Sequence, residues 1–428
     1  MRSLLAKLLV LSKMLVLAAL SLLVLVGERL IVESTTTVIS GRPTRVTSPL
    51  VLPLTGLTEI LTGSGKAKLF WSDVRRGVDP LGSPSGEQQL SERAQQRVRD
   101  YLYADGSSQQ QQQQQLFPTT VTQETLSKCG TRKLLQALPD GQSIESVLIP
   151  SYKHDRTTLC VSTQVGCDRG CAFCLTGKMG LLRNLTSDEI LSQVFRGLQV
   201  SLREQMPHMT NVVFMGMGDA GRNLDAVGAA VNAMVDRDCF RMASSKITVS
   251  TVGPSPEVFL EVAKMPVVIA WSLHSPDDSL RRMLVPSTRH TTAELREGLL
   301  AGLASRPNAR SRTIMIAFTI IAGINDSQGD AQLVADFVKP MLAVAPKIAI
   351  DLIPYNDIDV QGFSRPDVQR VNAFQRVLRE NGLFCSVRVT RGDDESSACG
   401  MLATASRRGT VGKFRGSPVS GMSGELNI

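Results

Sequence analysis

The sequence predicts an α/β protein built on a partial (β/α)6 barrel and preceded by a small helical accessory domain. From about residue 143, short β-branched apolar runs alternate with amphipathic stretches, and six such repeats indicate parallel strands covered by helices. Small or polar residues follow each run, and cysteines follow the first, as expected where parallel strands end at the face that carries the chemistry. The 428 residues are 43% hydrophobic and 20% charged, which excludes a disordered chain.

Residues 1–33 are expected to be a targeting presequence or a membrane anchor. Basic residues precede the first acidic residue, Glu28, and residues 14–26 are apolar except for Ser21. This run suits the apolar region of a signal sequence better than a bilayer span, which needs ~20 residues. We expect delivery to an organelle, a plastid or mitochondrion; the alternatives are a cytoplasmic protein and one tethered to a membrane with its catalytic domain on a reducing side. Residues 34–65, rich in Ser, Thr, Gly and Pro, predict a linker.

Residues 66–140 predict the helical accessory region. Apolar residues recur at helical spacing around Trp71 and again at Leu134, Leu135 and Leu138. The glutamine run at 109–115 interrupts this pattern and predicts a surface insertion, because such a segment cannot bury a core. The barrel itself is expected at 141–403, followed by a basic tail at 404–428.

The six barrel strands are expected at β-branched runs of the catalytic region: Leu159–Thr163, Asn211–Met215, Lys246–Ser250, Val267–Leu273, Thr313–Ile321 and Ile348–Ile353. The clearest predicted helix covers 187–202, and Thr186 with Glu189 forms the capping box that begins it. Because the carboxyl ends of parallel strands share one edge, the residues that follow the strands should surround a common site.

The residues Cys167, Cys171 and Cys174 form a C-x3-C-x2-C loop after the first of these strands. A structural zinc site needs four closed ligands, and no fourth Cys or His stands at usable spacing nearby. Three thiolates on a [4Fe–4S] cluster leave one iron open for a substrate. The spacing is the signature of radical S-adenosylmethionine (SAM) enzymes, in which SAM fills the open iron and is cleaved to a 5′-deoxyadenosyl radical.

Further blocks of sequence resemble the RlmN/Cfr family of radical SAM RNA methyltransferases. They are Thr158–Cys167, Arg183–Thr186, Val213–Gly218 and Arg391–Gly400, in order across about residues 141–403. The resemblance implies methylation of C2 of adenosine in 23S-type rRNA, in tRNA or in both, with a [4Fe–4S] cluster and SAM as cofactors. It implies a monomer that receives single electrons from a ferredoxin or flavodoxin.

The resemblance also assigns roles to two more cysteines. By motif, Cys399 is the S-methylcysteine intermediate, which takes a methyl group from one SAM before a second SAM generates the radical. Cys160 is the resolving residue, which forms a transient disulfide with Cys399. Glu145 stands at the position of the family's proton acceptor, with an exposed strand residue as the alternative. Cys129, Cys239 and Cys385 match nothing and are expected to be buried or incidental thiols.

The residues that match SAM-binding positions lie at the strand ends: Gly218, Asp219, Ser250, Ser272, Leu273, His274 and Asn356. The family has Gly-Glu-Pro where this chain has Gly218-Asp219-Ala220, so the carboxylate is kept on a shorter side chain. Phe173, inside the cysteine loop, is expected to pack over the cluster.

The net charge of +8 favours a polyanionic partner, and the resemblance makes that partner RNA. Arg281, Arg282, Arg289 and the basic tail are candidate phosphate contacts. Three alternatives remain open at this stage: methylation at C8 as in the Cfr branch, another RNA target, and a barrel that binds RNA or a cluster without catalysis, which the Gly-Asp-Ala change favours.

Overall fold

The computed structural model describes residues 47–82, 89–103 and 115–402. The predicted presequence or anchor, residues 109–114 of the glutamine run and the basic tail lie outside this part of the chain. Among the described residues, no helix is both long enough and apolar enough to cross a membrane.

A ten-stranded sheet forms the centre of the fold, in the order β1-β2-β3-β4-β7-β8-β9-β10-β11-β12. Its six middle strands are β4 (Arg156–Cys160), β7 (Met209–Phe214), β8 (Ile247–Thr251), β9 (Val268–Ser272), β10 (Thr313–Ile320) and β11 (Lys347–Pro354). Every neighbouring pair among these six strands is parallel. The predicted α/β class and the six predicted strands are therefore confirmed.

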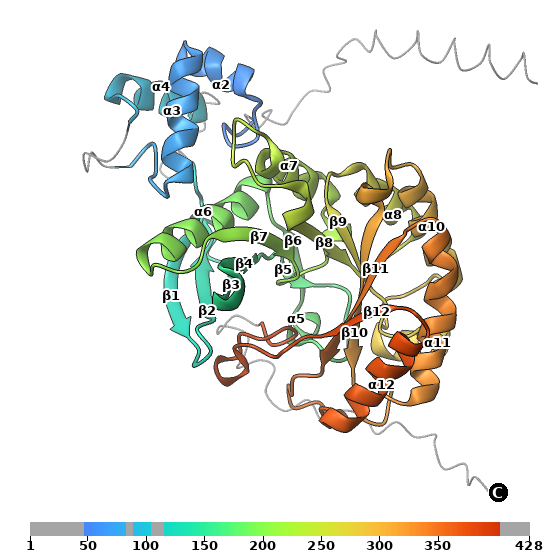
Figure 1. The fold of residues 1–428 in the computed structure, drawn as a ribbon. Coiled ribbons are helices and arrows are strands. Elements are labelled where there is room, and N and C mark those ends of the chain that lie inside the picture. Colours follow the sequence, from blue (N-terminus) through green and yellow to red (C-terminus); the bar gives the residue numbers. More distant parts are fainter. Residues whose placement is uncertain (1–46, 83–88, 104–114, 403–428) are drawn as a thin grey trace, which may run out of the picture. The chain divides into compact units, whose positions relative to one another are not determined.

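Helices follow the parallel strands, and those labelled in Figure 1 lie on the outside of the curved sheet. They are α6 (Ser187–Arg203), α7 (Leu224–Val235), α8 (Pro256–Lys264), α9 (Asp278–Leu284), α10 (Thr292–Ala304), α11 (Gln328–Val338) and α12 (Val368–Glu380). Helix α6 begins with the predicted capping box, because the Thr186 hydroxyl accepts from Glu189 N–H at 3.2 Å and Glu189 Oε2 accepts from Thr186 N–H at 2.8 Å.

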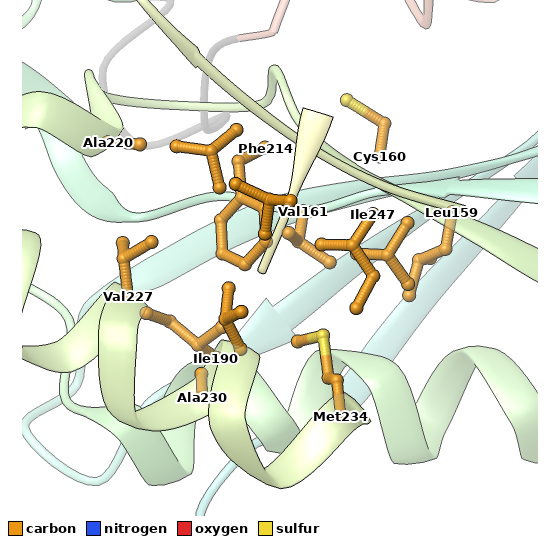
Figure 2. Close-up of a cluster of buried hydrophobic side chains, with 14 of the residues drawn as sticks. Leu159, Cys160, Val161, Ile190, Phe214, Ala220, Val227, Ala230, Met234 and Ile247 are labelled. Atoms are coloured by element: carbon orange, nitrogen blue, oxygen red, sulfur yellow. The ribbon is translucent and has the colours of Figure 1, made fainter. Parts of the chain in front are cut away.

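Successive residues of β4 and the residue after it point to opposite faces of the sheet, one toward the helices and one toward the site. Leu159 and Val161 are fully buried and lie among side chains of α6 and α7, such as Ile190 and Met234 (Figure 2). Cys160, between them, points away from these helices (Figure 2). This alternation is the ordinary consequence of strand geometry, and it sends the Cys160 sulfur toward the inner face.

Three antiparallel strands extend the sheet at one edge: β1 (Thr120–Leu126), β2 (Arg132–Ala137) and β3 (Ser143–Ser151). The helix predicted around Leu134 and Leu135 is therefore wrong, because β2 contains both residues. Adjacent leucines fit a half-buried strand as well as a helix when the run is short. At the other edge, β12 (Phe384–Val387) adds a parallel strand that the sequence analysis did not predict.

The accessory helices are α2 (Leu54–Leu61), α3 (Ser64–Arg75) and α4 (Glu92–Leu102). Helix α2 lies inside the segment 34–65 that was expected to be a linker. Helix α3 contacts the segment after α7: the Trp71 and Phe240 rings meet edge-on at 5.2 Å, and the Arg75 guanidinium donates to Asp238 O at 3.1 Å.

Candidate active site

The cysteine loop connects two short strands, β5 (Gln164–Cys167) and β6 (Gly180–Asn184), which form a separate antiparallel pair. Gly166 has φ +80°, and a Cβ atom there would lie 1.9 Å from the carbonyl oxygen of Gly180. Only glycine permits this crossing of the two strands. The loop also contains the one-turn helix α5 (Leu175–Lys178), which begins directly after Cys174.

The three thiols of the loop are free and partly desolvated. Burial raises the pKa of Cys167 to about 12 and the pKa of Cys171 well above its usual range, and the neighbouring thiols raise both further. Iron binding must therefore displace protons, as in other thiolate sites. In the described part of the chain, no three His, Cys, Asp or Glu side chains are close enough to hold one metal ion. A cubane fits this spacing better, since each thiolate binds a different iron.

The segment that carries Cys399 lies directly on the cysteine loop. Leu175 N–H donates to Gly400 O at 2.8 Å, and the Thr176 hydroxyl donates to Leu402 O at 2.6 Å. From the opposite side, Ala172 N–H donates to Leu284 O at 2.9 Å, at the end of α9. The loop is thus fixed between two segments distant in sequence.

Most of the predicted site residues surround one cavity, which we term the loop cavity. Its lining includes the three cysteines of the loop and seven other predicted residues: Gly218, Asp219, Ser250, Ser272, His274, Asn356 and Cys399. Among the predicted SAM-binding residues, Leu273 is the exception, since its side chain is fully buried in the apolar core. The strand ends therefore meet at one face, as the sequence predicted.

Asp219 is held firmly in the wall of the loop cavity. Its carboxylate accepts from Gly221 N–H at 2.7 Å, the Thr251 hydroxyl at 2.7 Å and Val252 N–H at 2.9 Å. Burial raises the pKa of Asp219, while these hydrogen bonds lower it. A carboxylate has about four lone-pair positions, so one remains for a cationic ligand group.

His274 is a neutral donor in the same wall. Its Nδ1 accepts from Thr319 N–H at 3.0 Å, so its proton is on Nε2. Burial, together with the nearby Arg281 cation, lowers the pKa of His274 to about 3. The Phe173 ring meets the imidazole edge-on at 4.5 Å. Ser250 and Ser272 lie beside it, with their hydroxyls 3.3 Å apart.

Cys399 lies on a wall that two cavities share. A second cavity, the relay cavity, has a volume of about 660 Å³ and is lined by both Cys160 and Cys399. Cys399, Asn356 and Met215 belong to the lining of both cavities. Asn356 fixes this position, because its Nδ2 donates to Cys399 O at 3.0 Å. All eight cysteines of the chain are free thiols in the structure.

Glu145 lies apart from both of these cavities. It lines a third pocket with Lys133 and Asp394, and its carboxylate is 3.2 Å from the Lys133 ammonium group. The side chain is buried, so the exposed-residue alternative is wrong. The structure does not bring Glu145 into the cavities that contain Cys399.

Comparison with known proteins identifies the family. No protein-family model matches the sequence. The chain is 38% identical over 289 residues to the dual-specificity RNA methyltransferase RlmN of Marinomonas sp. (strain MWYL1), which covers 66% of this chain and 75% of that protein. It is 35% identical over 341 residues to RlmN of Sorangium cellulosum (strain So ce56), covering 72% and 83%. The chain belongs to the RlmN family.

A solved structure agrees with this RlmN-family assignment. The crystal structure of a radical SAM methyltransferase from Sphaerobacter thermophilus superimposes with a TM-score of 0.71 at 32% identity. The match covers 83% of this chain and 99% of that one.

One residue expected to contact RNA is instead part of this RlmN-family core. Arg281 is fully buried, and its guanidinium donates to Ser272 O at 3.0 Å and to the carbonyl oxygens of Val252 and Leu273. Its guanidinium thus joins the carboxyl ends of β8 and β9. Arg282 and Arg289 are exposed.

Sequence reasoning missed several residues of this RlmN-family site. Arg388 and Asp351 pair near the two relay cysteines, with Nε 3.0 Å from Oδ2. Asn325 supports His274, because its Nδ2 donates to His274 O at 2.9 Å. Asn325 could have been found from the sequence, because its Gly-Ile-Asn-Asp loop follows a predicted strand. The Arg388–Asp351 pair could not, because its residues are distant in sequence and form no local pattern.

Proposed function

We propose that this protein is a radical SAM RNA methyltransferase that adds a methyl group to C2 of adenosine in 23S-type rRNA, in tRNA or in both. The observation that carries the proposal is the place of Cys399. It lies between the cavity of the cysteine loop and the cavity that contains Cys160. A carrier that receives a group on one side and delivers it on the other needs such a position.

The residues present fit the two implied cofactors. Cys167, Cys171 and Cys174 would hold a [4Fe–4S] cluster, and the remaining acceptor position of Asp219 with Nε2–H of His274 would hold SAM. When bound, the cluster supplies the electron that converts SAM to a 5′-deoxyadenosyl radical. A ferredoxin or flavodoxin would deliver that electron.

The chain's own contribution is a two-cysteine relay. The Cys399 thiolate takes a methyl group from SAM by displacement, and S-adenosylhomocysteine leaves. C2 of adenine lies between two ring nitrogens and is too electron-poor to take this methyl group directly. After the carbon is attached to C2, Cys160 Sγ attacks Cys399 Sγ, so that a disulfide forms while the bond between sulfur and the transferred carbon breaks. External reductant returns the thiols.

The relay cavity is the proposed entry for the nucleobase. Its volume of about 660 Å³ is in the range of ordinary ligand sites. Exposed Arg156 and His154 and half-buried Arg391 line it and would contact phosphates.

Turnover with reconstituted protein tests the proposal. Anaerobic protein with reductant, SAM and rRNA or tRNA should yield 5′-deoxyadenosine and 2-methyladenosine, measured by mass spectrometry. Cys399→Ala should abolish methylation, while Cys385→Ala, a buried thiol outside both cavities, should retain it. Production of 8-methyladenosine would instead assign C8 chemistry. Absence of 5′-deoxyadenosine from fully reconstituted protein would contradict the proposed mechanism.

We also propose that residues 1–33 deliver the protein to an organelle. Oxygen-sensitive iron–sulfur chemistry and a thiol pair that must be re-reduced disfavour an oxidising lumen. A fusion of residues 1–40 to a fluorescent reporter tests this: plastid or mitochondrial signal is expected, and diffuse or membrane fluorescence would favour the cytoplasmic or tethered alternatives.

A further inference from the structure

The charged pair Arg388–Asp351 occupies the inner side of the last two strands. Arg388 N–H donates to Leu352 O at 2.8 Å, which continues the parallel pairing of β12 with β11 by one residue. Its Nε donates to Asp351 Oδ2 at 3.0 Å, and Nη2 contacts the same oxygen. Asp351 is buried. The guanidinium is thus fixed in one orientation, as a planar charge-assisted contact requires.

Met215 links this guanidinium to Cys160. The backbone N–H of Met215 donates to the Cys160 sulfur, and the Met215 sulfur lies 3.9 Å from both Nη atoms of Arg388. Cys160, Met215 and Arg388 all line the relay cavity. A cation, a thioether and the resolving thiol therefore follow one another along a single wall.

Few charges act on the Cys160 thiol. Its sheet neighbours are apolar, Val147 on β3 and Val213 on β7. Burial and, to a smaller extent, the Cys399 thiol raise the pKa of Cys160 to about 12, and among the described residues Arg388 is the cation that lowers it. Arg156, Arg391 and His154, the other basic groups of the cavity, do not contribute to the pKa shift of Cys160, and neither does Asp351.

We infer that Arg388, oriented by Asp351, is a positioning residue that stabilises the Cys160 thiolate for the step that releases the methylated RNA. The inference rests on the proposed function, in which Cys160 must attack as a thiolate. The thiol loses its proton to solvent, the sulfur–sulfur bond forms, and the bond between Cys399 and the transferred carbon breaks. The transferred carbon keeps the electron pair of the broken bond and takes one proton from solvent to become the methyl group, so the step needs no further oxidant.

Thiol reactivity tests the inference without turnover. Reconstituted full-length protein is treated anaerobically with iodoacetamide at pH 8, and alkylation of each cysteine is followed by peptide mass spectrometry. A nearby opposite charge favours the thiolate, so Arg388→Met should slow alkylation of Cys160 by about five- to tenfold. Arg388→Lys, which keeps the positive charge, should stay within about threefold of wild type.

Two controls separate charge from misfolding. Arg391→Met removes a cation from the same cavity, where its guanidinium donates to Pro150 O at 3.1 Å, and should leave the Cys160 rate unchanged. Cys385, whose neighbouring cation is Arg379, is the reference thiol in the same digest. Unchanged Cys160 reactivity in Arg388→Met, or an equal loss in Arg388→Lys and Arg388→Met, would overturn the inference.

Turnover provides the second readout. Slow release should make Arg388→Met accumulate a covalent protein–RNA adduct, as Cys160→Ala should, and higher pH should relieve the adduct only in Arg388→Met. An adduct that persists equally in both variants at pH 9.5 contradicts the inference. Absence of any adduct in Cys160→Ala would instead contradict the proposed function, and the alkylation result would still stand.

Discussion

At the scale of single residues, hydrogen-bond partners decide what each polar group can do. His274 has φ +61°, and Thr319 N–H and Asn325 Nδ2 fix its ring nitrogen and its carbonyl oxygen respectively. The imidazole is therefore held neutral, as a donor through Nε2. Three protein donors likewise fix the orientation of the Asp219 carboxylate.

The buried His274 should make stability depend on pH. Its folded pKa of about 3 lies below the value of about 6.5 in the unfolded chain, so the unfolded state binds the proton more readily. This contribution is complete above pH 6.5 and is lost as the pH falls. Between pH 7 and pH 5, wild type should lose about 2 kcal/mol more unfolding free energy than His274→Asn, measured by urea titration. Asparagine tolerates positive φ and does not titrate; parallel pH curves for the two proteins would contradict the prediction.

At the scale of elements, the helices show how local sequence and packing combine. Helix α6 depends on its capping box, and helices α8 and α10 approach closely at Gly298, where a Cβ atom would lie 2.6 Å from the Cβ of Pro256. Gly228 in α7 meets only the flexible end of Met265, at 3.4 Å. Both glycines lie inside helices, but only Gly228 has space for a Cβ atom.

Paired alanine substitutions distinguish the two glycines. Gly298→Ala should destabilise the protein by about 1–3 kcal/mol, since overpacking outweighs helix propensity. Gly228→Ala should be neutral or stabilising by up to about 1 kcal/mol, because alanine restricts the unfolded chain and favours the helix. Denaturant midpoints measure both, and equal effects would show that the α8–α10 contact adapts freely.

The capping box gives a smaller effect with a conservative control. Thr186→Ala removes the acceptor for Glu189 N–H and should cost about 1 kcal/mol of unfolding free energy. Thr186→Ser keeps the hydroxyl and should cost little. A loss of similar size in both variants would mean that the methyl group of Thr186, rather than its hydroxyl, supports the helix.

The elements also show how far the sequence alone could lead. Six parallel strands and the α6 cap were predictable, because periodicity and capping residues are local signals. The edge strands were not, since the leucines of β2 fit two periods and only pairing with β3 decides between them. The positions of Cys399 and the loop cysteines followed from motifs, while Arg281 and Arg388 required the tertiary structure, which buries the first and pairs the second.

At the scale of the whole molecule, the net charge is +8, and some of the basic residues lie at one cavity. Basic residues line the relay cavity, and exposed Arg156 is among them. Because RNA binding by cations releases counterions, affinity should fall with salt.

Replacement of Arg156 measures this contribution. Arg156→Ala should weaken RNA binding about three- to tenfold at low salt and should reduce the slope of log affinity against log salt by about 1. Filter binding over a salt series provides the slope. Arg310→Ala, on an exposed arginine that lines neither cavity, is the control; an equal loss there would indicate diffuse attraction rather than a site at the relay cavity.

The hydrogen bonds from Leu175 and Thr176 to Gly400 and Leu402 tie the cysteine loop to a segment that follows every strand of the sheet. During translation the loop therefore emerges long before its covering segment. A chain that stops after β12 contains the whole sheet and all three loop cysteines, yet it lacks Cys399 and leaves the loop uncovered. Limited proteolysis should therefore cut such a truncated product first in the cysteine loop, because the covering segment around Gly400 and Leu402 is missing.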